Sequence, residues 1–140
     1  MTVEELYDLA ENEDVTVASF DLINREALSM MDPTGRCFVA IDPDRLSSTA
    51  DEKTKLAHEL GHCVTGSFYN VYSSCDSRQR YENRADKWAI KKLIPKDELE
   101  KAVSYGYTEA WQLADFFGVT EAFIRKAVSL YHYGNLYSIS

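Results

Sequence analysis

The sequence has no long apolar run. No stretch approaches the roughly 18 consecutive apolar residues that a membrane-spanning helix needs. Residues 1–5 include two acids, whereas a signal peptide begins with basic residues. Internal repeats and linkers are also missing. We therefore expect a soluble, cytoplasmic protein with no membrane partner. A chain of 140 residues, 45% of them hydrophobic, is long enough to bury one core without cross-links.

Cysteine is scarce in this chain. The three cysteines, Cys37, Cys63 and Cys75, are an odd number at irregular spacing, which does not fit the disulfide framework of a small secreted module. We expect all three to be reduced thiols. Cys63 adjoins His62, but a helix would turn the thiol about 100° away from the imidazole, so we expect Cys63 to pack rather than to bind metal.

Basic residues are too few to balance the acids. Fifteen Lys and Arg stand against 23 Asp and Glu, which gives a net charge of −8. This surplus of acids opposes binding to a nucleic-acid backbone, so we expect no direct nucleic-acid partner. Residues 78–101 are locally basic. Such a strip is usually a solvated helix face, although it could steer an acidic partner.

His58, Glu59 and His62 form an H-E-x-x-H motif. In an α-helix, residues four apart lie on one face, so both imidazoles can direct a nitrogen at one metal ion. Glu59 lies one position further round the helix, where its carboxylate can take a proton from a water that zinc acidifies to a pKa of about 7. The motif is that of zinc hydrolases. It predicts one Zn²⁺ ion and names Glu59 as the catalytic base.

The alternative is that these polar residues share a solvated helix face by chance. The flanking residues argue against it. Leu56 and Leu60 form an apolar line, while Ala57 and Gly61 form a line of small residues where a second helix could approach closely. A helix packed in this way would bury its histidines, and buried imidazoles need polar partners.

The periodicity of the sequence predicts an α+β fold in a single domain, residues 1–140. We expect a first part over residues 1–46, with a helix over 3–11 and strands over 15–22, 25–31 and 36–41. These strands should form a small antiparallel sheet, with a tight turn at 32–35, that packs on a zincin-like pair of metal-binding helices. The helix pair should occupy residues 47–94.

Capping residues and breakers set the expected helix ends. We expect the first metal-binding helix to start near Ala50, with a Thr49/Glu52 capping box, and to stop at Gly66. A loop should follow over 67–77, and the second metal-binding helix should run over 78–94. We expect the C-terminal part, residues 95–140, to be helical. One helix should run from Pro95 to Gly106, and Thr108 and Thr120 should cap a helix-turn-helix-like pair split by Gly118, before a tail over 131–140 that could dock or extend.

A catalytic zinc usually keeps three protein ligands, so a third must come from outside the motif. Glu82 and Asp86 lie one turn apart on the second predicted helix, which makes Glu82 the expected ligand and Asp86 the acceptor for a free imidazole nitrogen. Two alternatives stay open. The two acids could pair with neighbouring bases along a surface helix, or the third ligand could be one of the other candidates, His132, Asp76 and Cys75. His132 or a tyrosine could also stabilise the oxyanion.

Two motifs occur together in this chain. The first is His58-Glu59-Leu60-Gly61-His62, and the second is Glu82-x-x-Ala85-Asp86-x-Trp88-Ala89, followed by Leu93-Ile94-Pro95. With both motifs the chain resembles the ImmA/IrrE family of metallopeptidases over roughly residues 36–130. Trp88 departs from the family, which more often has Phe there.

The resemblance implies a gluzincin-like site in which His58, His62 and Glu82 bind zinc and Glu59 is the base. It also implies a partner. By this resemblance the chain is similar to anti-repressors of the family, which are often encoded by phages and integrative elements and cut a helix-turn-helix repressor, commonly after DNA damage. Other members of the family act in general DNA-damage responses. The expected setting is the cytoplasm of a bacterial or phage-infected cell.

Other functions remain open at this point. Residues 111–128 have the pattern of a helix-turn-helix core, but the second helix offers only Arg125 and Lys126 as cations for DNA. The chain could also keep the zinc fold and sequester a repressor without cutting it. If the chain is an enzyme, the strand over 36–41, placed at a sheet edge, could pair with an extended substrate segment.

Overall fold

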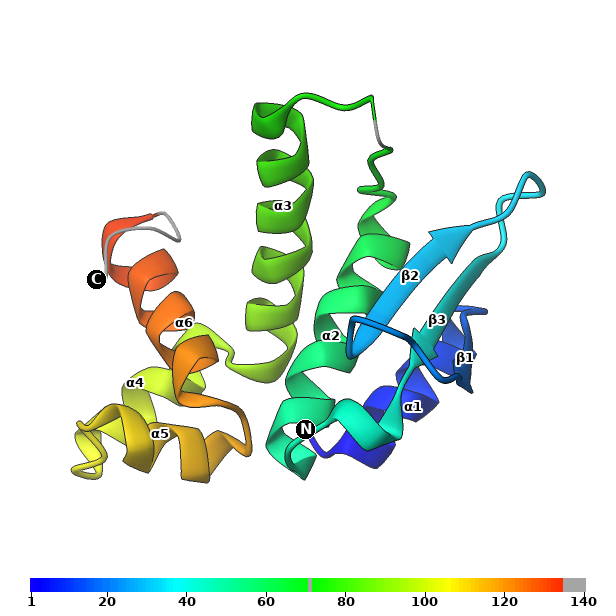
Figure 1. Cartoon of the computed structure of the whole chain (residues 1–140). Coiled ribbons are helices and arrows are strands. Elements are labelled where there is room, and N and C mark those ends of the chain that lie inside the picture. The colour runs from blue at the N-terminus through cyan, green and yellow to red at the C-terminus, as the bar shows by residue number, and fades with distance from the viewer. Residues whose placement is uncertain (71, 135–140) are drawn as a thin grey trace.

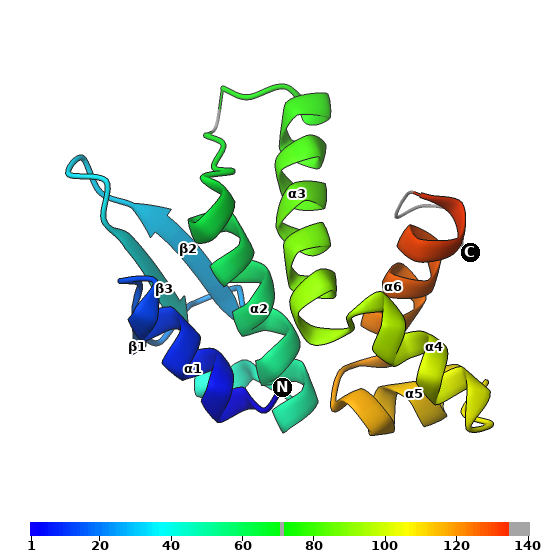
Figure 2. The same cartoon turned by 180° about the vertical axis from the view of Figure 1, so that it is seen from behind.

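A long helix pair stands at the centre of the computed structural model, which describes residues 1–70 and 72–134 (Figure 1). The helices are α1 (Val3–Asn12), α2 (Thr49–Thr65), α3 (Cys75–Leu93), α4 (Lys96–Ser104), α5 (Ala110–Phe117) and α6 (Glu121–Tyr133), with a short 3₁₀ turn at Pro43–Arg45. Figures 1 and 2 both place α2 between the sheet and α3, with α4, α5 and α6 on the far side of α3. The expected α+β architecture is confirmed.

The sheet is mixed rather than antiparallel. Its strands β1 (Thr16–Ser19), β2 (Ala27–Met31) and β3 (Cys37–Ile41) lie in the order β1-β3-β2, with β1 parallel and β2 antiparallel to β3. The predicted all-antiparallel sheet is therefore wrong at β1. The segment after β1 crosses to the far side of β3 instead of making a hairpin, and this leaves β3 as the central strand.

One apolar core joins the sheet to α1, α2 and α3. The fully buried members include Leu6, Val39, Leu56, Leu60 and Ile90. Apolar positions in β3 alternate, so that Cys37, Val39 and Ile41 are buried while the residues between them are partly exposed. This alternation fixes which face of the sheet covers α2.

The ends of α2 hold the motif in place. Ser48, not Thr49, is the N-cap, and its hydroxyl accepts a hydrogen bond from the Asp51 N–H. The predicted capping box is thus wrong by one residue. The predicted stop is confirmed, because Gly66 adopts the left-handed conformation (φ 67°) that ends a helix and that glycine accepts without strain.

The third helix begins earlier than the sequence predicted. Ser74 caps it, so α3 includes Cys75, and the predicted loop over 67–77 is correspondingly shorter. At its other end α3 stops at Leu93, one residue short of the predicted end, and Ile94 is its C-cap. Asp86 and Glu82 both lie well inside α3, on a rigid element.

The C-terminal helices follow the predicted order with one wrong cap. Thr120 caps α6 as predicted, but α5 starts from a capping box of Glu109 and Gln112, not from Thr108. Gly118 ends α5 in the left-handed conformation. The predicted tail falls partly outside the described residues, at 135–140.

Two of the three cysteines form a disulfide. Cys37 of β3 and Cys63 of α2 are bonded, while Cys75 is a free, exposed thiol. The expectation of three reduced thiols is therefore wrong for this pair. Packing α2 across β3 brings together two thiols that are 26 residues apart in the chain. Cys63 does pack against the core and does not contribute to the metal-ligand group, as expected.

Among the residues that the structure describes, no helix is both long enough and apolar enough to cross a membrane.

Candidate metal centre

Close contact between α2 and α3 brings the two motifs together. Gly61 lies directly against the backbone of Ala85, and a Cβ atom at position 61 would stand only 2.5 Å from the Ala85 carbonyl oxygen. Only glycine fits at this crossing. The small residues thereby let the face of α3 that bears Glu82 reach the face of α2 that bears His58 and His62.

The side chains of His58, His62 and Glu82 converge on one point. The His58 Nε2 atom lies 2.8 Å from Glu82 Oε2, the His62 Nε2 atom lies 3.0 Å from Glu82 Oε1, and the two Nε2 atoms are 3.2 Å apart. The three ligand atoms lie within 4.8 Å of one another. His62 is buried and the other two residues are half-buried.

The spacing of these atoms fits a small divalent metal ion. Zinc bonds of about 2.0–2.2 Å in a tetrahedral arrangement separate ligand atoms by about 3.3 Å. The observed separations of 2.8, 3.0 and 3.2 Å need only a small expansion to reach that value. Two imidazoles and a carboxylate are also a donor set that zinc accepts, with one position left for water or substrate.

The other nitrogen of each imidazole is held by a fixed acceptor. His58 Nδ1 donates to Asp86 Oδ1 at 2.7 Å, and His62 Nδ1 donates to the Ser67 carbonyl just beyond the end of α2. Because carboxylates and carbonyls can only accept, both Nδ1 atoms must bear the proton. With Nδ1 holding the proton, the Nε2 atom of each neutral imidazole can direct its lone pair at a bound metal ion.

A lysine from α6 completes this arrangement. Lys126 Nζ lies 3.0 Å from Asp86 Oδ2, so Asp86 is held between a cation on one side and His58 on the other. Asp86 is buried, with its side chain only 10% exposed, and a buried carboxylate needs such partners. The sequence did not indicate Lys126, since α6 is far from the motif along the chain.

The charges of the cluster stabilise one another. Burial alone would lower the pKa of His58, but hydrogen bonds to Asp86 and Glu82 outweigh burial and raise the pKa to about 10. Burial would raise the pKa of Glu82, but the two imidazoles hold that pKa well below its usual range. His58 and Lys126 likewise outweigh burial and lower the pKa of Asp86. Without metal, His58 is thus an imidazolium between two carboxylates.

Glu59 lies beside the ligands without joining them. Its Oε1 atom accepts a hydrogen bond from the Ser29 hydroxyl of β2 at 2.8 Å. Within the described residues Oε2 has no hydrogen-bond partner, so one carboxylate oxygen is open to a water. Glu59 adjoins His58 in α2, and its partner Ser29 lines the same hollow as His62 and Glu82, so the carboxylate lies near the candidate metal position. Sequence spacing gave no sign of Ser29, which comes from the sheet.

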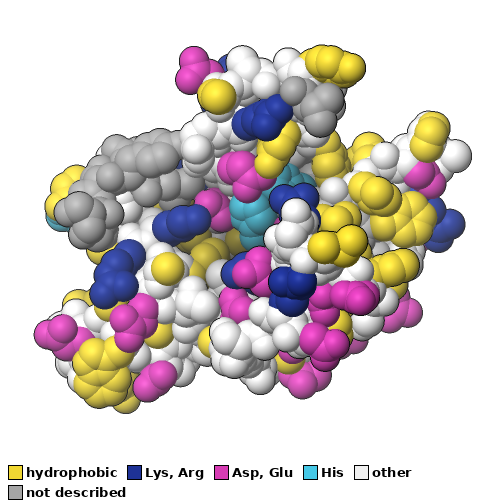
Figure 3. All heavy atoms as spheres, in the orientation of Figure 1, with side chains coloured by type: hydrophobic (Ala, Val, Ile, Leu, Met, Phe, Trp, Pro, Cys, Tyr) yellow, Lys and Arg dark blue, Asp and Glu magenta, His cyan; other side chains and the backbone are white. Residues whose placement is uncertain are grey.

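Two hollows flank the cluster. A larger one of about 470 Å³ lies on the α6 side and is lined by His58, Glu82, Asp86, Phe123 and Lys126, among others. A smaller one of about 120 Å³ lies on the β2 side, next to His62 and Glu82. Figure 3 shows histidine surface at the bottom of a depression near the middle of this face, with acidic and basic side chains around it.

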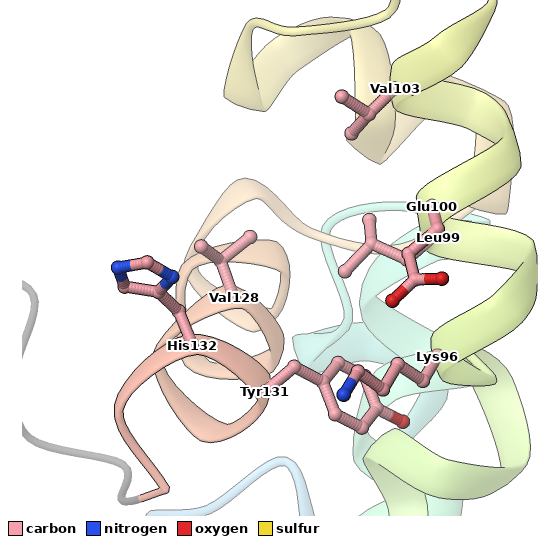
Figure 4. A pocket seen from close by; sticks show the side chains of 7 residues that line it. All are labelled: Lys96, Leu99, Glu100, Val103, Val128, Tyr131 and His132. Atoms are coloured by element: carbon pink, nitrogen blue, oxygen red, sulfur yellow. The ribbon is translucent and has the colours of Figure 1, made fainter.

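The competing third ligands lie elsewhere. His132 lines a different hollow, between α4 and α6, together with Leu99, Val128 and Tyr131 (Figure 4). Asp76 and Cys75 occupy the exposed first turn of α3, and a helix places Asp76 about 9 Å along its axis from Glu82. The structure therefore groups Glu82, not these residues, with the two histidines.

The chain was also compared with known proteins. A family model described as the IrrE N-terminal-like domain (Peptidase_M78) matches residues 10–129. The chain belongs to the IrrE-like family. The match confirms the ImmA/IrrE resemblance and extends it toward the N-terminus, over the last turn of α1 and strands β1 and β2. No curated protein matches this IrrE-like chain.

Proposed function

We propose that this IrrE-like protein is a zinc-dependent endopeptidase whose metal is bound by His58, His62 and Glu82. The convergence of the three ligand atoms within 4.8 Å is the observation that supports it most directly. Membership of a peptidase family supports the reaction class. Zinc is the metal that best suits two imidazoles, one carboxylate and an open position.

The residues around the metal position divide the chemistry of peptide hydrolysis. A bound zinc ion supplies a Lewis acid that polarises a carbonyl and acidifies water. Glu59 accepts a proton from the attacking water through its open Oε2 atom and then delivers that proton to the amine that leaves as the C–N bond breaks. Ser29 holds the other oxygen of Glu59, and Asp86 holds the His58 ring in place.

The substrate segment cannot pair with residues 36–41. That strand is β3, and it lies between β1 and β2, so the earlier hypothesis of an edge strand there is wrong. In the described sheet β2 is the edge strand on the side of the metal centre, as its Ser29–Glu59 hydrogen bond shows. We propose that an extended substrate segment adds to β2 and passes between the two hollows.

We propose that the natural partner is a helix-turn-helix repressor. The protein would then act as an anti-repressor, either in the induction of a mobile element or in a DNA-damage response. The proposed location is the cytoplasm of a bacterial or phage-infected cell. The ImmA/IrrE resemblance supports this role. The net charge of −8 favours a protein or peptide substrate over nucleic acid. Direct DNA binding by α5 and α6 is the least supported reading, since Lys126 is already paired with Asp86.

Metal content tests the ligand set. We expect the purified protein to hold about one zinc per chain and Glu82→Ala to lose most of it, as measured by elemental analysis after dialysis against a weak chelator. Asp76→Ala, an acid in the first turn of the same helix, is the matched control and should keep its zinc. Equal zinc in the wild type and in Glu82→Ala would refute the site.

Cleavage tests the enzyme against a sequestering protein. Glu59→Gln should keep the zinc but slow peptide hydrolysis by about 10²–10⁴. If Glu59→Gln relieves repression by a co-expressed repressor as well as the wild type does, the protein acts by sequestration. If relief is lost while binding persists, the protein acts by cutting.

A further inference from the structure

The small hollow beside β2 lies directly against two metal ligands. It measures about 120 Å³, and its walls include His62 and Glu82 together with Arg25, Leu28, Ser29 and Tyr69. Arg25 lies just before β2, while Tyr69 belongs to the segment that connects α2 to α3. A substrate segment along β2 would therefore pass this hollow next to the bond being cut.

Arg25 is the unusual residue of this hollow. Its side chain is exposed, and within residues 1–70 and 72–134 it makes no ion pair and no hydrogen bond. The cations of the larger hollow differ, because Lys55 is paired with Asp51 and Lys126 with Asp86. In a chain with 23 acids against 15 bases, an arginine without a carboxylate partner beside the metal ligands calls for an explanation.

The other polar groups of the hollow already have partners. The Ser29 hydroxyl donates to Glu59, and Glu82 is shared between His58 and His62. Tyr69 lines the same hollow as Glu82 and Arg25. Burial and Glu82 raise the pKa of the Tyr69 hydroxyl, and the charge of Arg25 acts against them. The guanidinium is thus the group left to meet a ligand.

We propose that this hollow is a substrate subsite that takes an acidic side chain, Asp or Glu, and that Arg25 selects it. A guanidinium binds a carboxylate through two parallel hydrogen bonds, so it favours acids over neutral side chains of similar size. The inference rests on the proposed peptidase function and adds the class of residue recognised beside the cut. Arg25 is a specificity residue here, and the reaction itself does not require it.

Cleavage of a peptide library measures this preference. The zinc-loaded wild type, Arg25→Gln and Arg25→Glu are each incubated with a proteome-derived peptide mixture, and the cut sites are read by mass spectrometry. We expect the wild type to show an enrichment of acids at one position next to the cut. In Arg25→Gln this enrichment should fall about fivefold, as loss of an exposed ion pair implies. In Arg25→Glu, Lys or Arg should replace the acids at that position. Arg36→Glu, which makes the same charge change on the exposed β2–β3 turn, should keep the wild-type preference.

Two results would overturn the subsite. Wild-type cutting without any enrichment of acids would do so, and so would unchanged enrichment in Arg25→Glu. Failure of the peptidase function looks different, because the mixture would then contain no cuts that disappear in Glu59→Gln.

A binding measurement tests the subsite without any cleavage. Two peptide hydroxamates, with Glu or Lys beside the metal-binding group, are titrated into zinc-loaded Glu59→Gln by calorimetry. We expect the Glu peptide to bind about fivefold more tightly and the added Arg25→Glu change to reverse the order. Equal affinities would refute the role of Arg25 even if the protein cuts nothing.

Discussion

Each imidazole of the candidate metal centre is oriented by a residue outside the proposed ligand set. Asp86 holds His58 and the Ser67 carbonyl holds His62, and in turn Lys126 holds Asp86. Such contacts fix the proton on Nδ1 and stop the ring from rotating. At the scale of single residues, the candidate metal centre therefore depends on supporting contacts from α3, α6 and the segment just after α2.

Replacing Asp86 should weaken metal binding without removing a ligand. In Asp86→Asn the amide oxygen can still accept from His58, but it lacks the charge, so we expect zinc affinity to fall about 10- to 100-fold. Competition with a chromophoric chelator measures the change. Asp76→Asn, at the exposed start of α3, should bind zinc like the wild type. An Asp86→Asn protein with wild-type affinity would show that Asp86 does not orient the ring.

The stability of the metal-free protein should depend on pH through His58. The pKa of His58 rises from 6.5 to about 10 on folding, so its stabilising effect is complete below pH 6.5 and is lost as the pH rises toward 10. Glu82 and Asp86 have lowered pKa values and stay ionised throughout this range. Chelator-treated wild type should therefore exceed Asp86→Asn in unfolding free energy by more at pH 6 than at pH 9, measured by urea denaturation. A difference independent of pH would contradict this.

The candidate ligands could be predicted from the sequence, but their supporting contacts could not. The spacing of His58, Glu59 and His62 follows directly from helix geometry, and Glu82 lies within reach on the next helix. Ser29 and Lys126 come from a strand and a helix, and they lie 29 and 68 residues from His58 in the sequence. Nothing local marks them, because their role appears only when the sheet and α6 pack against the helix pair.

At the scale of elements, the crossing of α2 and α3 sets the geometry of the site. The sequence predicted small residues at this crossing, and Gly61 against Ala85 confirms it. The sheet was harder to predict. Alternation shows that β1, β2 and β3 are strands but does not state which strands are neighbours, so the parallel pairing of β1 with β3 and the Cys37–Cys63 bond became visible only in the fold.

A methyl group at Gly61 should damage both stability and metal binding. A Cβ there would lie 2.5 Å from the Ala85 carbonyl oxygen, so α3 must move away from α2 and take Glu82 with it. We expect Gly61→Ala to lose about 1–3 kcal/mol of unfolding free energy and to bind zinc more weakly, measured by urea denaturation and chelator competition. Val64→Ala, near the end of the same helix, should keep its zinc affinity. A more stable Gly61→Ala protein would contradict the close packing.

At the scale of the whole molecule, two lysines connect the C-terminal helices to the helix pair. Lys126 reaches from α6 to Asp86, and Lys53 reaches from α2 to the Phe117 carbonyl at the end of α5. Lys53 is buried, only 6% exposed, and its Nζ atom lies 2.6 Å from that carbonyl. A cation at the C-terminus of a helix also meets the negative end of the helix dipole.

The lysine under α5 should couple the unfolding of the two parts. In Lys53→Met the Phe117 carbonyl loses its charged partner, so we expect a loss of about 1–3 kcal/mol that falls mainly on the C-terminal helices. Trp88 lies on α3 and Trp111 on α5, so single-tryptophan proteins with the other residue changed to Phe report on each part separately. In the wild type both fluorescence signals should change at the same urea concentration. In Lys53→Met the Trp111 signal should change first, whereas Lys101→Met, an exposed lysine on α4, should leave the two signals together. If both midpoints move equally in Lys53→Met, the Lys53 contact does not couple the C-terminal helices to the helix pair, and the buried amine contributes only to general stability.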